Sequence, residues 1–159
     1  MSEMDEKFMR RAIELAQNGV DSNAGGPFGC VIALDGKIVG EGVNRVTSTN
    51  DPTAHAEVVA IRDACKNLDS FQLNGCVVYT SCEPCPMCLG AIYWARPERV
   101  FIACDRNDAA EAGFDDAFIY DELCGNNFAD RKVSISILLR DEGLKVFKNW
   151  TAKPDKIEY

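Results

Sequence analysis

Apolar residues recur every three or four positions in several parts of the chain, which is the pattern of an amphipathic helix. Two such stretches cover residues 4–18 and 55–68. A third, 86–95, begins with Pro86, a residue favoured at the first position of a helix. Residues 141–152 are predicted to form a closing helix. The positions expected to face the core are Phe8, Ala12, Leu15 and Gly19 in the first helix, and Val58, Ile61, Cys65 and Leu68 in the second.

Short apolar runs lie between these helices and predict β-strands. Residues 28–43 contain two runs around Asp35 and Gly36, and a central Asp-Gly pair is a strong signal for a β-hairpin. Further strands are predicted at 76–80, 99–103 and 133–139. Strands therefore alternate with helices in the central part of the chain.

The order of these elements predicts the fold class. Strand 76–80, helix 86–95 and strand 99–103 form a strand–helix–strand unit, which implies parallel pairing through a right-handed crossover. The hairpin adds antiparallel pairs, so the sheet should be mixed. We expect an α/β protein with a single domain over residues 1–159, built as a three-layer α/β/α sandwich with a central mixed sheet.

The charge of the chain narrows the class of partner. Asp and Glu number 25 and Lys and Arg 17, which gives a formal charge of −8. Such a surface repels phosphate backbones, and no cluster of Lys or Arg with interleaved aromatic residues offsets it. We therefore expect a small neutral molecule as the substrate and no nucleic acid.

Two further observations concern location. No apolar run approaches the roughly 20 residues that a membrane helix needs, and the charged, amphipathic start differs from a signal peptide. We expect a cytoplasmic protein with no membrane partner. In a reducing compartment, the eight cysteines are expected to be ligands, reactive thiols or buried apolar residues rather than disulfide partners.

Three cysteines, Cys82, Cys85 and Cys88, fall within seven positions. Cys85 and Cys88 share one face of the predicted helix and lie in its first turn, where the helix dipole favours thiolates. A zinc site takes four protein ligands if structural, or three and a water if catalytic. His55, the only histidine, begins another predicted helix and can supply a ligand. The residues alone leave open whether Cys82 is a ligand.

Glu57 follows His55 by two positions. Since positions i and i+2 do not share a helix face, Glu57 is not expected to bind the metal beside His55, but it can reach the space next to it. A carboxylate there can carry the protons of an activated water. The combination H-x-E…P-C-x-x-C, present as HAE at 55–57 and PCPMC at 84–88, is the signature of zinc-dependent nucleobase deaminases.

Longer stretches resemble the bacterial guanine deaminases of the cytidine deaminase-like fold. The resemblance covers nearly the whole chain and includes GGPFG, NDPTAHAEVVAIR, YTSCEPCPMCLGAIYWARP and AAEAGFDD. It implies that His55, Cys85 and Cys88 bind one zinc ion per subunit and that Cys82 does not. It also implies that Glu57 is the proton carrier.

The same resemblance assigns residues that contact the substrate. Phe28 and Trp94 would flank a flat base. Asn44 would hydrogen-bond the edge of the base, and Asp116 would face the exocyclic amino group as a second catalytic acid/base. Each also has a plainer interpretation: Phe28 and Trp94 suit a core, Asn44 suits a turn, and Asp116 with Asp115 suits a helix cap.

The C-terminal residues 151–159 are polar in composition, and such tails usually fray. In the enzymes that the chain resembles, this end crosses to the partner subunit, and its terminal Tyr closes the neighbour's pocket. The resemblance therefore implies a homodimer that exchanges about residues 141–159 and places Tyr159 against the substrate.

The implied activity is zinc-dependent hydrolysis of guanine, a purine base, to xanthine and ammonia in purine salvage or catabolism. The enzyme would be a hydrolase acting on C–N bonds in cyclic amidines. Guanosine is the first alternative substrate, followed by cytosine and other amino-heterocycles, whereas tRNA editing fits the acidic charge poorly. The alternative outside enzymes is a structural zinc protein, which would need Cys82 as a fourth ligand.

Overall fold

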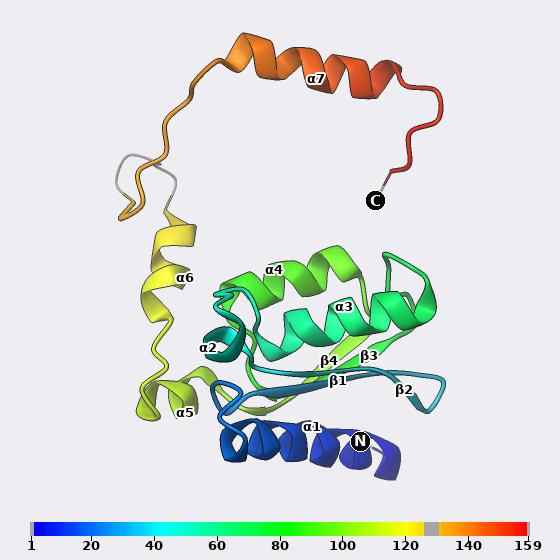
Figure 1. The fold of residues 1–159 in the computed structure, drawn as a ribbon, viewed down its shortest axis with the longest axis vertical. Coiled ribbons are helices and arrows are strands. Elements are labelled where there is room, and N and C mark those ends of the chain that lie inside the picture. Colours follow the sequence, from blue (N-terminus) through cyan, green and yellow to red (C-terminus); the bar gives the residue numbers. More distant parts are fainter. Residues whose placement is uncertain (1, 126–130, 159) are drawn as a thin grey trace. The chain divides into compact units, whose positions relative to one another are not determined.

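A four-stranded sheet forms the centre of the fold (Figure 1). Its strands are β1 (Gly29–Leu34), β2 (Lys37–Val43), β3 (Val77–Cys82) and β4 (Arg99–Cys104), arranged in the order β2-β1-β3-β4. β1 pairs antiparallel with both β2 and β3, whereas β3 and β4 pair parallel. The mixed sheet, the hairpin and the parallel strand–helix–strand unit predicted from the sequence are confirmed.

The computed structural model describes residues 2–125 and 131–158 and divides into two compact units, Met1–Asp116 and Ala117–Tyr159. The first unit holds the sheet and five helices, which are α1 (Glu3–Asp21), α2 (Val46–Thr49), α3 (Ala56–Leu68), α4 (Pro86–Ala95) and α5 (Arg106–Glu111). Across the described residues, none of the helices combines the length and apolar character needed to cross a membrane.

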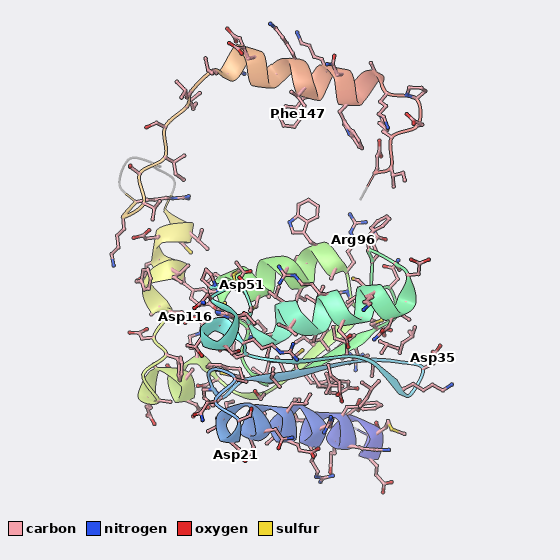
Figure 2. The ribbon with its side chains drawn as sticks, viewed as in Figure 1. Asp21, Asp35, Asp51, Arg96, Asp116 and Phe147 are labelled. Atoms are coloured by element: carbon pink, nitrogen blue, oxygen red, sulfur yellow. The ribbon has the colours of Figure 1, made fainter. Side chains whose placement is uncertain are left out.

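The turn between β1 and β2 follows its sequence signal. Asp35 and Gly36 have φ angles of 50° and 74°, the left-handed conformation that a type I′ turn requires at both central positions. Figure 2 labels Asp35 at this tip of the hairpin. The turn sets the register in which Leu34 pairs with Lys37.

Helix α1 covers one face of the sheet. Its buried residues Phe8, Ala12 and Leu15 form a cluster with Val31 of β1 and Tyr79 of β3. These helix residues belong to the face predicted from their spacing, so that prediction is confirmed. Helices α3 and α4 lie on the opposite side of the sheet (Figure 1), which completes three layers.

Helix α3 meets the sheet through a different face from the one expected. Ala56, Ala60 and Ala64 are fully buried, whereas the predicted Ile61, Cys65 and Leu68 are only partly buried at the margin of the cluster. Glycines of β2 explain the difference. A Cβ at Gly40 would lie 2.6 Å from the Ala60 carbonyl oxygen, and one at Gly42 would lie 2.1 Å from that of Ala56. Small residues on both sides let the helix backbone approach the strand closely.

The second unit contains α6 (Ala117–Cys124) and α7 (Arg140–Ala152). α7 is close to the closing helix predicted over 141–152, and α6 begins directly after Asp116, where the sequence suits a helix cap. Residues 133–139, predicted to be a strand, form none in this structure. An extended segment becomes a strand only when a neighbour satisfies its backbone N–H and C=O groups. The helices of this unit contain no buried residue among those described.

Candidate active site

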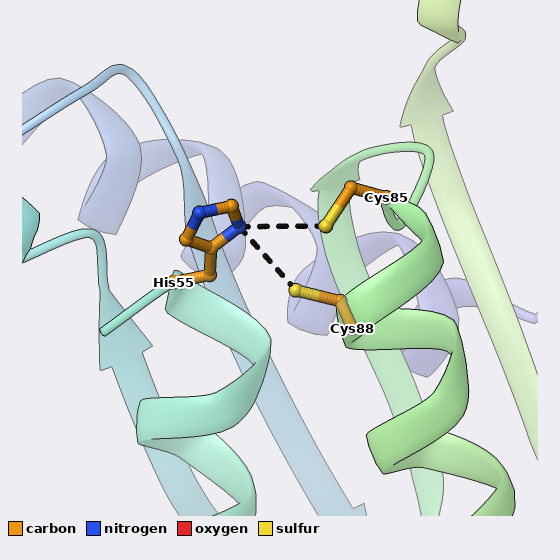
Figure 3. A group of neighbouring side chains, drawn as sticks. All are labelled: His55, Cys85 and Cys88. Atoms are coloured by element: carbon orange, nitrogen blue, oxygen red, sulfur yellow. Dashed lines mark hydrogen bonds between the residues drawn. The ribbon is translucent and has the colours of Figure 1, made fainter. Parts of the chain in front are cut away.

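Two helix starts bring the predicted ligands together. His55 is the N-cap residue of α3, and Cys85 is the N-cap residue of α4, both with extended backbone. Pro86 then opens α4, and Cys88 lies in its first turn. Because α3 and α4 lie on the same face of the sheet, these starts are neighbours. Figure 3 shows the side chains of His55, Cys85 and Cys88 pointing toward one another.

The distances in this cluster suit a tetrahedral zinc ion. The ligand atoms of the three residues all lie within 4.8 Å of one another. His55 Nδ1 is 3.6 Å from Cys85 Sγ and 3.5 Å from Cys88 Sγ. With Zn–S bonds of about 2.3 Å and Zn–N bonds of about 2.0–2.1 Å, tetrahedral geometry places such atoms about 3.6 Å apart. The distances from His55 Nδ1 to both sulfur atoms therefore fit a shared zinc ion.

Cys82 stands apart from the cluster. It is the last residue of β3, it is buried, and its Sγ donates to the carbonyl oxygen of Asp105 at 3.5 Å. Within residues 2–125 and 131–158, the possible ligand group consists of His55, Cys85 and Cys88. Three protein ligands leave one tetrahedral position open, which is the arrangement of a catalytic zinc site.

The two sulfur atoms differ in their readiness to ionise. Hydrogen bonding to Cys85 raises the pKa of the Cys88 thiol, whereas Cys85 is the sulfur prepared to bind a cation. A hydrogen bond from Cys88 lowers the pKa of Cys85 to about 4, and the positive end of the α4 dipole favours the thiolate further. Hydrogen bonding to Cys85 raises the pKa of His55. Because zinc binds cysteine as thiolate, a sulfur that is already ionised is suited to hold it.

Glu57 lies in the first turn of α3, and its carboxyl group is buried beside the cluster. Its Oε1 accepts a hydrogen bond of 3.2 Å from Thr80 Oγ1. Burial raises the pKa of Glu57 above its ordinary value. A buried carboxyl whose pKa is raised is more readily protonated than an ordinary one, which suits a proton carrier.

A cavity of about 380 Å³ opens beside these groups. Sites for small molecules usually enclose about 300–1,000 Å³. The predicted site residues on its wall are Phe28, Asn44, His55, Glu57, Cys85 and Asp116. Two of the three predicted metal ligands, both predicted acid/base groups and two of the predicted base-binding residues therefore share one cavity.

Asn44 has a fixed orientation at this cavity. Its Oδ1 accepts hydrogen bonds from the backbone N–H groups of Gly26 and Val46, both at 3.2 Å. Gly25 permits this arrangement, because a Cβ there would lie 2.4 Å from Asn44 Oδ1. Two N–H donors at one atom identify it as the oxygen. The amide nitrogen of Asn44 is therefore the atom left to donate to a ligand.

An aromatic pair and a carboxyl group complete the wall. Phe28 packs edge-to-face against Phe114, with ring centroids 5.0 Å apart, and both rings line the cavity. Phe28 also packs on the core below, so its two interpretations are compatible. Asp116 is half-buried, and burial followed by the negative charge of Cys85 raises its pKa. It stands directly before α6, the position of a helix cap.

Comparison with known proteins places this geometry in a family. Residues 2–104 match the family model described as the cytidine and deoxycytidylate deaminase zinc-binding region. The chain belongs to this deaminase family. The matched region is a zinc-binding one, and His55, Cys85 and Cys88 are the residues within it that would hold the ion.

Several known proteins are similar to this chain over most of its length. A guanine deaminase of Bacillus subtilis is 55% identical over 97% of this chain and 98% of its own length. The X-ray structure of guanine deaminase from Bacillus subtilis matches with a TM-score of 0.95 at 54% identity, covering 100% of this chain and 99% of that one. A tRNA-specific adenosine deaminase of Haemophilus influenzae is 43% identical over 69% of this chain and 64% of its own length.

Trp94 and Tyr159 are the remaining predicted substrate residues. Trp94 is in α4 with 65% of its surface exposed, and it does not line the described cavity. Tyr159 falls outside the described residues. Their contacts with a base stay predictions.

The cavity also contains residues that sequence reasoning did not single out. Glu83 accepts bonds from Arg106 at its mouth, 3.1 Å from Nε to Oε1 and 3.1 Å from the backbone N to Oε2. Phe114 is a second such residue. Thr80 lies below the cavity and bonds Glu57. The pairs Glu83–Arg106 and Glu57–Thr80 are each 23 residues apart in sequence, so no local spacing reveals them.

Proposed function

We propose that this protein hydrolyses guanine to xanthine and ammonia, with one zinc ion bound per subunit. One observation carries the proposal: a three-ligand zinc cluster and a buried glutamate share a cavity the size of a small-molecule site. The choice of guanine is supported by the 55% identity to a guanine deaminase over nearly the whole chain.

The chemistry divides between the ion and the side chains. Zinc held by His55, Cys85 and Cys88 would lower the pKa of a water molecule to about 7 and so provide a nucleophile at neutral pH. Glu57 would accept a proton from the attacking water and pass it to the ring nitrogen beside the carbon that carries the amino group. Asp116 would face the amino group and help to protonate it, so that it leaves as ammonia.

Orientation of the base would come from the cavity wall. The ring of Phe28 offers an apolar surface for a flat base. The fixed amide nitrogen of Asn44 would donate to an acceptor on the edge of the base, as the N–H bonds to its oxygen require. Both roles would hold the base in the cavity beside the metal cluster and Glu57.

Other functions fit less well. A structural zinc site would need a fourth protein ligand, and Cys82 is bonded to Asp105 instead. The −8 charge disfavours tRNA as a substrate. Guanosine and cytosine retain the same zinc chemistry, so they are the alternatives that a substrate assay must separate. The cytoplasmic location expected from the sequence stays a prediction.

The proposal includes a homodimer that exchanges its C-terminal segment, about residues 141–159. Helix α7 carries apolar side chains with large exposed fractions, 68% for Val146 and 70% for Phe147. Apolar surface of this kind commonly marks a protein–protein contact. A truncation lacking residues 155–159 should keep zinc but lose most activity, because Tyr159 would no longer close the neighbour's pocket. Full activity in that truncation would contradict the exchange.

The experiment for the zinc site compares the wild-type protein with Cys85→Ala. We expect the wild type to bind about one zinc ion per subunit at the three-ligand site and to form xanthine from guanine. Cys85→Ala should lose both the zinc and the xanthine. Cys104→Ala is the matched control, since Cys104 is exposed at the end of β4 outside the ligand cluster. Xanthine formation by zinc-free Cys85→Ala would refute this site.

A further inference from the structure

Thr80 is a polar residue on an otherwise apolar face of β3. Side chains alternate along a strand, so Tyr79 joins the cluster under α1, while Val78 joins the cluster under α3. Thr80 shares the face of Val78 and is 1% exposed. Its neighbour across the antiparallel pair is Cys30, which is also fully buried.

Packing alone does not explain a threonine here. Valine has nearly the same shape, and valine already occupies the same face two residues earlier. A buried hydroxyl group is unfavourable unless it forms a hydrogen bond. The hydroxyl of Thr80 forms one, with Glu57 Oε1 at 3.2 Å, and the carboxyl that receives it is itself 6% exposed.

This bond joins Thr80 of β3 to the carboxyl group of Glu57, which would carry the protons. Cys88, as a thiolate ligand of the metal, would have no proton to donate to Glu57. Thr80 keeps its hydroxyl proton whether or not the cluster holds a metal. It is therefore a side-chain donor that can hold Glu57 Oε1 during the reaction.

We propose that Thr80 is a positioning residue: its hydroxyl fixes Oε1 of Glu57, so that the other carboxyl oxygen faces the cavity and the reacting atoms. The inference rests on the proposed deaminase function. Proton transfer requires the carrier within about 2.6–3.2 Å of its partner. Without the Thr80 bond, the carboxyl group can rotate about its last torsion and is aligned for a smaller fraction of the time.

The test uses two substitutions that separate shape from the hydroxyl. Thr80→Val keeps the volume and removes the donor. Thr80→Ser keeps the donor and removes a buried methyl group. Val78→Ala is the control for packing, since it removes buried atoms of the apolar cluster on the same face. For each variant, kcat and KM for guanine, zinc content and Tm are measured.

We expect Thr80→Val to lower kcat by about 10- to 100-fold, the size of a lost hydrogen bond to a charged group, with KM, zinc content and Tm close to wild type. Thr80→Ser should recover kcat to within about threefold while lowering Tm, as a cavity forms. Val78→Ala should lower Tm and leave kcat in place. The variant that loses activity is therefore not the one that loses stability.

Two results would overturn the positioning role. One is a kcat for Thr80→Val within about twofold of wild type, which would make Thr80 a core residue. The other is a kcat that follows Tm across all three variants, which would reveal a purely structural effect. Failure of the proposed function is recognised separately, because the wild type itself would then release no ammonia from guanine. If another amino-heterocycle is the substrate, the same comparison of variants applies to it.

Discussion

Tyr79 and Thr80 are adjacent in β3, point to opposite faces of the sheet, and each donates a hydroxyl proton to a carboxylate near a helix start. Tyr79 bonds Asp5 Oδ1 at 2.7 Å under α1, and Thr80 bonds Glu57 Oε1 at 3.2 Å under α3. The pKa values of the two carboxyl groups nevertheless shift in opposite directions. The pKa of Asp5 falls to about 2, whereas that of Glu57 rises.

The environment of each carboxylate explains the difference. Asp5 is only half-buried, and its pKa is lowered chiefly by the hydrogen bond from the Ser2 backbone within the capping box of α1, with Tyr79 adding to it. Glu57 is buried, and the loss of solvation outweighs its hydrogen bonds. The same type of bond therefore stabilises a helix cap on one face and holds a proton carrier on the other.

The largest effect expected from this contrast is on catalysis. Glu57→Gln should lower kcat by about 10²–10⁴-fold, the usual contribution of a general acid/base. Zinc content should stay near that of the wild type, because Glu57 is outside the ligand cluster. Asp5→Asn is the matched control and should leave kcat unchanged. Near-normal turnover by Glu57→Gln would contradict the role of Glu57 as the proton carrier.

Asp116→Asn should have a smaller effect. We expect kcat to fall about 10- to 100-fold, at the low end for an acid/base group, because Asp116 assists Glu57 rather than replacing it. Asp115→Asn is the control, since it alters the neighbouring carboxyl on the same loop. Steady-state kinetics of both variants would measure the difference, and equal losses in the two would assign the effect to the loop rather than to Asp116.

The dependence of Tm on pH under acidic conditions tests the lowered pKa of Asp5. The pKa of Asp5 is about 2 in the folded protein, below the ordinary value of 3.8. The ionised carboxylate therefore stabilises the fold at pH values above 3.8, and this contribution is lost as the pH falls through the folded pKa. The Tm of the wild type should therefore exceed that of Asp5→Asn at neutral pH. Thermal melts should show this difference shrinking between about pH 4 and pH 2. A difference that is constant over this range would contradict the lowered pKa.

The smallest expected effect belongs to Tyr79. Tyr79→Phe removes the bond to Asp5 and should lower the free energy of unfolding by about 1 kcal/mol, with kcat unchanged. Urea denaturation and guanine turnover measure the two quantities. A loss of turnover in Tyr79→Phe would show that the α1 face contributes to catalysis, which the contrast between the faces excludes.

Some features of the fold and the site are predictable from local sequence patterns, and others are not. The hairpin, the start of α4 at Pro86 and the ligand spacing of Cys85 and Cys88 are local signals, and the structure follows them. The bond between Thr80 and Glu57 depends on pairing between distant segments, so no spacing predicts it. The close approach of α3 to β2 depends likewise on Gly40 and Gly42 in another element.

Residues 133–139 show a second limit. Their apolar pattern suits a strand, but a strand also needs a partner edge, and the pattern carries no information about which edge that is. The predicted roles of Trp94 and Tyr159 likewise cannot be obtained from the local pattern of residues. They rest on resemblance to relatives rather than on any signal in the spacing of this chain.

The central claim is that the zinc cluster and Glu57 serve the deamination of guanine, and substrate selectivity tests it most directly. Protein carrying one zinc per subunit is incubated with guanine, guanosine, cytosine and adenine, and released ammonia is measured. The account predicts rapid release from guanine, with xanthine as the product, and little from the other three. Release from guanosine or cytosine but not from guanine would contradict it.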